Sequence, residues 1–190
     1  NSFPASGEVI TTPDISAVIQ EVVNLSAWCG GKDLNILIDP MLSDVPAPHP
    51  WLGTSRFNKE LPIEIEQLPK IDAVIISHDH YDHLDLDSLE KLIPKTAQYY
   101  VALGCGRHLE KWGVETSKIK EFDWWDVQSF HGVDITFTPT RHFSGRGLKD
   151  RAKSLWGGWV FRTNNENIYF SGDGGYGEHF KEVGKRLGPF

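Results

Sequence analysis

The sequence predicts an α/β fold built in layers, and three observations carry that prediction. Short runs of apolar, β-branched and aromatic residues alternate with segments in which apolar residues recur every three to four positions. The early part of the chain reads strand, helix, strand, helix, which is typical of a sheet covered by helices. The sequence shows no repeat with a period of roughly 20–50 residues, which argues against a solenoid.

Each element has its own local signal. Apolar or alternating runs bounded by turn residues predict strands at 35–40, 71–77, 97–103, 118–123, 133–140, 157–163 and 167–173. The last two form a predicted hairpin around the sequence NNEN. Apolar spacing near 3.6 residues predicts helices at 86–93, 104–114 and 178–188. Asp87 is the predicted N-cap of the first helix, and Gly113 and Gly188 are the predicted stops of the other two.

Two segments are harder to interpret. Residues 1–34 mix helical and strand signals, so they support no assignment. Residues 43–62 hold four prolines and predict a long surface loop, which in a compact domain is often functional. Trp51, Leu52 and Phe57 on this loop either form an apolar lip over a site or pack into the core.

Composition bounds the class of protein. The chain has 190 residues, 39% of them apolar, so a single domain over residues 1–190 is expected. Its formal net charge of −7 makes general nucleic-acid binding unexpected. Cys29 and Cys105 match neither a disulfide framework nor a CxxC motif, so we expect reduced thiols and a cytoplasmic location. No apolar run approaches the ~20 residues that a membrane span needs.

The sequence VIISHDHYDHLD (74–85) places histidines and aspartates directly after an apolar strand. Ligand sites in open sheets lie beyond the carboxyl ends of the strands, and imidazole and carboxylate groups suit zinc. His78 and His80 are two residues apart in an extended turn and can face one ion. Asp82 and His83 can face a second ion. Two ions therefore fit this short segment better than one.

Two further candidates also follow predicted strands. His142 comes after the strand at 133–140, and Asp173 ends the strand at 167–173 with glycines on both sides. Small neighbours allow close approach to the backbone, and the two oxygens of Asp173 suit it to bridge two ions. Asp79 and Asp85 are left over from the cluster, and capping or solvation is their default role.

The motif HDHYDH (78–83) fits H-x-H-x-D-H, the signature of the metallo-β-lactamase superfamily. IDP at 38–40, TRHFSGR around His142 and FSGDGGY around Asp173 follow in the order of that family. FDWWD, HFSGR and KSLWGGWVF resemble more narrowly the branch that contains N-acyl-phosphatidylethanolamine-hydrolysing phospholipase D and its bacterial relatives. The resemblance covers about residues 35–190 and implies an αββα sandwich.

The resemblance also implies a set of metal ligands. They are His78, His80 and His142 on metal 1, Asp82 and His83 on metal 2, and Asp173 bridging both. The family has one more histidine on metal 2, downstream of where this sequence ends. We therefore expect a domain that is incomplete at its C-terminus, with metal 2 the less complete site. None of the remaining histidines is assigned a ligand role, and His179, on the predicted helix at 178–188, ranks first among them as a substitute.

The implied chemistry is hydrolysis. A pair of divalent ions lowers the pKa of a bridging water from 15.7 towards ~7 and polarises the attacked group, so no protein nucleophile is needed. The sequence contains no G-x-S-x-G motif and no supported Cys–His pairing. Asp79 is the predicted residue that holds or accepts a proton beside the hydroxide, and Asp82 is the second predicted catalytic residue.

Substrate recognition has weaker signals. Arg141, Arg146 and Lys149 lie near His142 in the sequence and either meet a phosphate or are ordinary solvated surface. The tryptophans predicted to pack in the core and hairpin rather than in a lipid groove are Trp124, Trp125, Trp156 and Trp159.

The leading hypothesis is a metal-dependent hydrolase with two Zn2+ ions that attacks a phosphodiester, with a lipid-derived substrate suggested by the resemblance. Its alternatives are a lactonase or esterase of the same fold and a metal-binding but inactive fragment. Zinc is favoured over iron because iron-using relatives tend to place a carboxylate at the position of His80. A small-molecule or lipid substrate is expected. Peripheral membrane contact and homo-oligomerisation are left open.

Overall fold

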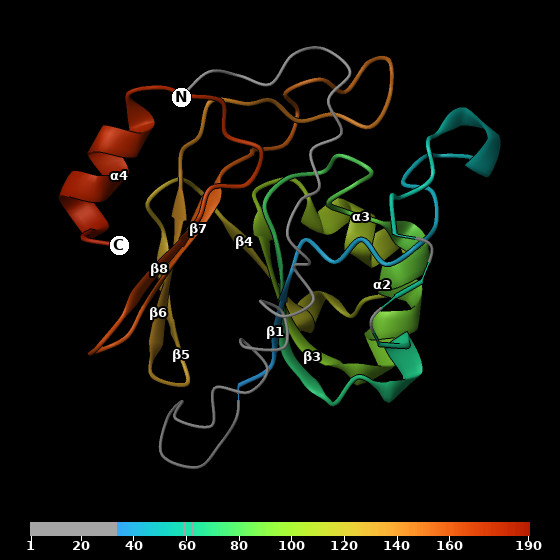
Figure 1. Ribbon diagram of the computed structural model, residues 1–190, viewed down its shortest axis with the longest axis horizontal. Helices are drawn as coiled ribbons and strands as arrows, with labels where there is room; N and C mark the ends of the chain where they lie inside the picture. The colour runs from blue at the N-terminus through green and yellow to red at the C-terminus, as the bar shows by residue number, and fades with distance from the viewer. Residues whose placement is uncertain (1–33, 59, 62) are drawn as a thin grey trace. The chain divides into compact units, whose positions relative to one another are not determined.

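Two four-stranded sheets organise the chain (Figure 1). The computed structural model describes residues 34–58, 60–61 and 63–190. Residues 1–33 and the predicted thiol Cys29 lie outside the described residues. The first sheet is parallel throughout and has the order β1-β2-β3-β4, with strands Ile36–Ile38, Ile71–Ile76, Thr96–Ala102 and Ile119–Phe122.

The second sheet is antiparallel and has the order β5-β6-β7-β8. Its strands are Val127–Phe130, Val133–Thr138, Gly158–Arg162 and Asn167–Phe170. β6 and β8 run in the same direction because each pairs antiparallel with β7. Their carboxyl ends therefore lie at one edge of this sheet.

Helices cover the outer faces of both sheets. Figure 1 shows α2 (Leu86–Leu92) and α3 (Gly106–Lys111) beside the first sheet and α4 (His179–Leu187) beside the second. Short 3-10 turns complete the described elements: η1 (Pro50–Leu52), η2 (Ile65–Gln67), η3 (Ile93–Lys95) and η4 (Thr116–Lys118). The layers run helix, sheet, sheet, helix, as predicted.

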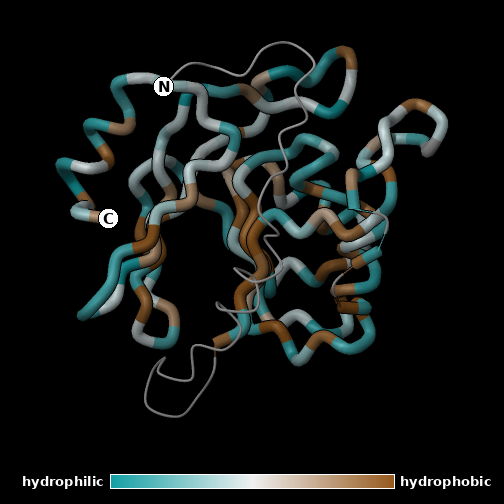
Figure 2. The backbone as a smooth tube through the Cα atoms, viewed as in Figure 1, coloured by the Kyte–Doolittle hydropathy of each residue, from teal (hydrophilic) through white to brown (hydrophobic). Residues whose placement is uncertain are grey.

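The core lies between the two sheets, where Figure 2 shows hydrophobic strands. Trp159 of β7 is fully buried, and its ring centroid lies 5.1 Å from that of Phe122 in β4 and 4.6 Å from that of Phe137 in β6. The indole N–H of Trp159 donates to the backbone carbonyl of Ile76 at 3.2 Å, which ties β7 to the end of β2. Burying a tryptophan is favourable when its polar N–H finds such a partner.

One local prediction was wrong, and one strand was missed. The N-cap of α2 is Asp85, whose carboxylate accepts from the backbone N–H of Ser88 at 3.1 Å, rather than Asp87. β5 was not predicted because it is an edge strand with alternating exposure, and its Val127 side chain is 56% exposed. The β7–β8 hairpin was predicted correctly.

The loop at residues 43–58 exposes its large apolar side chains. Trp51 is 79% exposed, Leu52 55% and Phe57 97%, so these side chains do not pack into the core, and of the two alternatives the apolar lip stays a prediction. Of the four tryptophans, Trp159 is a core residue, while Trp124 is 36% exposed and donates its indole N–H to the carbonyl of Trp156. Among the described residues, no helix combines the length and apolar character needed to cross a bilayer.

Candidate metal centre

Four strand ends bring the candidate ligands together. Asp39 follows β1 and the segment 78–83 follows the neighbouring parallel strand β2, so both lie at the same sheet edge. His142 follows β6 and Asp173 follows β8 in the facing sheet. An isolated bridge between Arg141 and Gly175 pairs these last two loops, with the Gly175 N–H donating to the Arg141 carbonyl at 3.0 Å.

Glycines let the Asp173 loop pass close to the rest of the protein. Gly172 has a φ of +56°, and a Cβ there would lie 2.8 Å from the carbonyl oxygen of Gly157. A Cβ at Gly174 would lie 2.1 Å from the hydroxyl oxygen of Thr140. Both positions therefore exclude larger residues, in agreement with the small neighbours expected around a carboxylate ligand.

Three imidazoles form the first donor group. The Nε2 atom of His78 lies 2.9 Å from Nδ1 of His80 and 3.1 Å from Nε2 of His142, and the latter two atoms are 3.2 Å apart. Three nitrogens that bind one tetrahedral ion at about 2.0–2.1 Å lie about 3.4 Å apart. The observed triangle is slightly tighter, and its donor set fits a single ion.

The tautomer of His78 supports this reading. The Ser77 hydroxyl donates its one hydrogen to Asp39 Oδ2 at 2.5 Å, so it accepts at its contact of 2.9 Å with Nδ1 of His78. Nδ1 of His78 then carries the hydrogen, and the lone pair of its Nε2 faces the other two imidazoles. Second-shell hydrogen bonds of this kind orient histidine ligands at metal sites.

Electrostatics keep the first group neutral, the form that binds metals. Burial, followed by repulsion from His83, His80 and His142, lowers the pKa of His78 to about 2. Burial is also the main cause that lowers the pKa of His80 and of His142. Neutral imidazoles whose lone pairs converge repel one another unless a cation lies between them.

Asp82, His83 and Asp173 form the second donor group. Nε2 of His83 lies 3.1 Å from Oδ2 of Asp173 and 3.7 Å from Oδ2 of Asp82. The same Asp173 oxygen lies 3.9 Å from Nε2 of His142 in the first group. Asp173 therefore stands between the two groups, where the sequence analysis expected a bridging carboxylate.

Asp39 belongs to this site and was missed from the sequence. Its Oδ1 accepts from the Ser77 N–H at 2.7 Å, and its Oδ2 accepts from Nδ1 of His83 at 2.8 Å. Burial alone would lower the pKa of His83, but this hydrogen bond and the charges of Asp39, Asp173 and Asp82 raise it to about 9. An aspartate directly after a strand parallel to β2 was the signal that could have identified it.

Asp79 has an environment that differs from the proton-transfer role predicted for it. It is fully buried, its Oδ1 accepts from the Gly145 N–H at 2.6 Å, and its Oδ2 accepts from the Ser154 hydroxyl at 2.6 Å. Burial alone would raise its pKa, but the His108 imidazole, whose Nε2 lies 3.7 Å from Oδ2, and hydrogen bonds from Ser154 and Gly145 lower it to about 2. Such a carboxylate is a weak base near neutral pH, and these contacts suit it to fasten the His142 loop to the 78–83 segment.

Arg146 joins the same two segments in the opposite direction, from the His142 loop to the 78–84 segment. Its guanidinium donates to the backbone carbonyls of Asp79, His80 and Leu84 at 3.0, 3.4 and 2.5 Å, and it lies 4.0 Å from the ring centroid of Tyr81. The hydroxyl of Tyr81 donates back to the Arg146 carbonyl at 2.9 Å. The interpretation of Arg146 as ordinary solvated surface was therefore wrong, and a contact between Arg146 and phosphate stays a prediction.

The other predicted contacts lie apart from the donor groups. Arg141 donates to the carbonyl of Tyr176 at 3.1 Å, and Lys149 lines a surface hollow described below. His179 lies 3.3 Å from the hydroxyl of Thr140 and belongs to none of the donor groups found among the described residues. His179 is therefore not brought into place as a substitute ligand.

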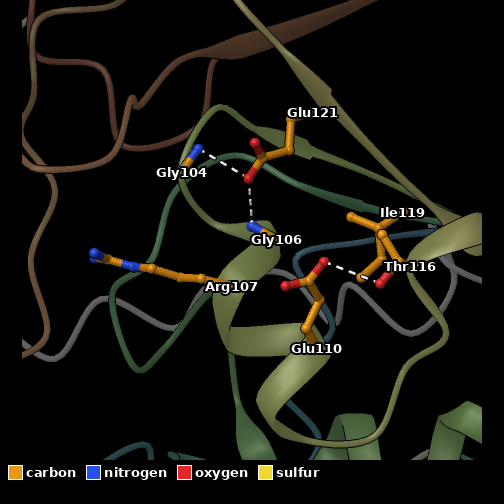
Figure 3. Close-up of a pocket in the computed structure, with 7 residues that line it drawn as sticks. All are labelled: Gly104, Gly106, Arg107, Glu110, Thr116, Ile119 and Glu121. Carbon is orange, nitrogen blue, oxygen red and sulfur yellow. Dashed lines mark hydrogen bonds between the residues drawn. The ribbon is translucent and has the colours of Figure 1, made fainter.

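A separate hollow of about 470 Å³ lies between α3 and β4 (Figure 3). The carboxylate of Glu121 accepts from the N–H groups of Gly104 and Gly106 at 2.9 and 2.8 Å, and Glu110 accepts from the Thr116 hydroxyl at 3.1 Å. Its acidic groups are thus already partnered within the protein. None of the predicted metal ligands lines this hollow.

Comparison with known proteins identifies the family. A family model described as a beta-lactamase superfamily domain matches residues 34–190, and the chain belongs to that superfamily. An uncharacterized protein of Mycobacterium tuberculosis is 42% identical over 156 residues, which cover 82% of this chain and 41% of the relative. N-acyl-phosphatidylethanolamine-hydrolyzing phospholipase D 1 of Caenorhabditis elegans is 32% identical over 169 residues, which cover 84% of this chain and 47% of the relative.

Solved structures agree on the fold. The isothiocyanate hydrolase from Delia radicum gut bacteria matches with a TM-score of 0.57 and 25% identity, covering 80% of this chain and 60% of that one. CmlA, a diiron beta-hydroxylase from Streptomyces venezuelae, matches with a TM-score of 0.58 and 21% identity, covering 81% and 29%. The chain spans less than half the length of the first curated relatives that it matches. The predicted superfamily and fold class are confirmed.

Proposed function

We propose that this chain is the metal-binding part of a hydrolase that uses two zinc ions to cleave a phosphodiester. The observation that carries the proposal is the convergence of three imidazole nitrogens within 3.2 Å of one another, with Asp173 between them and His83. Nitrogen-rich sites with carboxylate support suit zinc. The diiron neighbour shows that the fold also holds iron, so metal identity needs its own measurement.

The residues of this chain divide the work. His78, His80 and His142 would hold one ion, Asp82 and His83 would hold the second, and Asp173 lies between the two groups. When bound, such a pair of ions supplies Lewis acidity and makes water a nucleophile at neutral pH. Asp39 orients His83. Asp79 and Arg146 hold the loop that follows His142 in a fixed position relative to the 78–83 segment.

The phosphodiester part of the proposal is supported by relatives. Proteins from C. elegans and Saccharomyces cerevisiae that are 32% and 36% identical carry the name N-acyl-phosphatidylethanolamine-hydrolyzing phospholipase D. The alternative, attack at carbon as in a lactonase or esterase, is favoured by the isothiocyanate hydrolase at 25% identity. Cys105, which is buried and unpaired, supports the cytoplasmic location that we propose with this function.

Turnover of two phosphodiesters and a lactone tests the proposal. Zinc-loaded protein is assayed with bis(p-nitrophenyl) phosphate, with a γ-lactone and with an N-acyl-phosphatidylethanolamine, and the expected result is hydrolysis of the two phosphodiesters. His142→Ala should abolish that turnover, and His131→Ala, on the exposed β5–β6 turn, should leave it unchanged. Hydrolysis of the lactone alone would favour the alternative. Bound zinc without turnover of any substrate would favour an inactive metal-binding domain.

A further inference from the structure

A loop between His142 and β7 exposes one apolar side chain completely. We call residues 145–153 the basic loop. Leu148 at its centre is 104% exposed. The Asp150 carboxylate accepts from the N–H groups of Gly147 and Arg146 at 2.7 and 3.2 Å, and the Lys153 N–H donates to the Asp150 carbonyl at 3.1 Å. These internal hydrogen bonds hold the loop in a turn. The turn places Leu148 in solvent.

Cations surround this apolar tip. A hollow of about 500 Å³ beside it is lined by Arg107, Gly147, Leu148, Lys149, Asp150 and Lys153. Three of these side chains are positive and one is negative, on a chain whose formal net charge is −7. The negative one, Asp150, is already engaged by backbone N–H groups. Of the three cations, Arg107 lies 3.9 Å from the carboxylate of the buried Asp79. Among the described residues, no ion pair involves Lys149 or Lys153, so these two lysines carry the available positive charge.

Arg151 extends the same surface. Its guanidinium lies 4.1 Å from the ring centroid of Phe143, which is itself 37% exposed next to the ligand His142. A hydrophobic tip between hydrophilic stretches is visible on this loop in Figure 2, and Figure 1 shows the loop projecting beyond the ends of the sheets. An exposed apolar residue surrounded by cations suits a surface that is negative outside and apolar inside.

The basic loop is tied to the candidate metal centre. The Gly145 N–H donates to Asp79, which lies between His78 and His80, and Arg146 is clamped on the carbonyls of the same segment. Whatever the loop binds is therefore held at a fixed position relative to the donor groups. Because the basic loop follows His142 closely in the sequence, a surface that binds the loop would also lie close to the candidate metal centre.

We propose that the basic loop docks this protein on the surface of an anionic lipid bilayer, with Leu148 entering the interface and Lys149 and Lys153 facing the headgroup phosphates. Lysine and arginine near an anionic leaflet bind by electrostatic attraction, and an apolar side chain adds affinity by leaving water. A fluid surface also requires no shaped pocket, which agrees with exposed lysines that lack fixed partners. The proposal does not depend on the reaction catalysed, because binding is measured without turnover.

Vesicle co-sedimentation tests the proposal with matched variants. The full chain is mixed with vesicles of equal parts phosphatidylcholine and phosphatidylglycerol, and with vesicles of phosphatidylcholine alone. Preferential binding to the anionic vesicles is expected. The double variant Lys149→Glu/Lys153→Glu should bind them at least about tenfold more weakly. The double variant Lys181→Glu/Lys185→Glu, with the same charge change on the exposed face of α4, should bind nearly as wild type.

The apolar contribution has its own comparison. Leu148→Ser should weaken vesicle binding severalfold, while Ile168→Ser, at a 44% exposed position on β8, should not. Equal loss in both lysine pairs would show only a net-charge effect and would overturn the proposal. So would binding that is insensitive to Leu148→Ser and is displaced by inorganic phosphate, which would identify a soluble-anion site. Circular dichroism spectra of all variants, expected to match wild type, establish that each one is folded.

Discussion

The two donor groups of the candidate metal centre differ in how completely the protein builds them. In the first group, three imidazole nitrogens lie within 2.9–3.2 Å of one another, and His78 is 1% exposed. In the second, the Asp82 and Asp173 side chains are 56% and 45% exposed, and the closest contact to His83 Nε2 is 3.1 Å. The first group is preorganised, whereas the second depends on exposed carboxylates. We therefore expect two ions bound with unequal affinity.

The difference follows from what supports each group. His78 is held by Ser77, which follows a strand buried at every position except Asp72, and the His142 loop is fastened through Asp79 and Arg146. In the second group, His83 has Asp39 as a fixed partner behind it, and no such hydrogen bond from another described residue supports Asp82 or Asp173. Ligands locked by surrounding hydrogen bonds lose less freedom on binding a metal, and this raises affinity.

The largest expected effect comes from removing a ligand of the first group. Four-ligand zinc sites bind with about 10–16 kcal/mol, so His142→Ala should weaken the tighter site at least about a hundredfold. Competition with a fluorescent chelator measures this affinity. His131→Ala, which removes a histidine from the β5–β6 turn, is the matched control. If His142→Ala left the tighter affinity unchanged, the first group could not be that site.

Breaking the fastening between the loops comes next. Arg146→Ala removes three hydrogen bonds from a guanidinium to buried carbonyls and its contact with Tyr81, so the free energy of unfolding should fall by about 3 kcal/mol. Urea denaturation of the metal-free protein measures it. Arg141→Ala loses one hydrogen bond, to the Tyr176 carbonyl, and should cost less than about 1 kcal/mol. An equal decrease in the free energy of unfolding in the two variants would show that Arg146 does not stabilise the protein more than an ordinary surface arginine.

Asp39→Asn sharpens the comparison because Asp39 contacts His83 of the second group directly and reaches His78 of the first group only through Ser77. An asparagine side chain lacks the charge that orients and polarises His83, so the weaker site should lose about 10–100-fold in zinc affinity. The tighter site should change less. Calorimetric titration with zinc resolves the two events. A larger loss at the tighter site than at the weaker one would reverse the assignment of Asp39.

The smallest effect on the tighter site is expected from Asp82→Ala. Because Asp82 is 56% exposed and contacts only the second group, its loss should remove or weaken the second binding event and leave the first within about twofold. Cobalt substitution gives an independent readout, since the absorption of cobalt bound by three histidines should persist in this variant. Loss of both events together would mean that the two groups act as a single site.

Much of the fold and of the centre was predictable because the signals are local. The H-x-H-x-D-H motif lies within six residues, and His142 and Asp173 each stand at a strand end. Asp39 carried a similar signal and belongs to the IDP sequence quoted for the family resemblance, but it was given no role in the site. The role of Arg146 was not predictable, because its partners are backbone carbonyls 62 to 67 positions away. β5 was not predicted because an exposed edge strand has little apolar pattern.

The most direct test is a calorimetric zinc titration of the metal-free protein, with bound metal counted by mass spectrometry after dialysis. The account predicts two ions per chain in two resolved events, of which the tighter is lost in His142→Ala and the weaker in Asp82→Ala. A single event, or two events that respond to neither substitution, would contradict it.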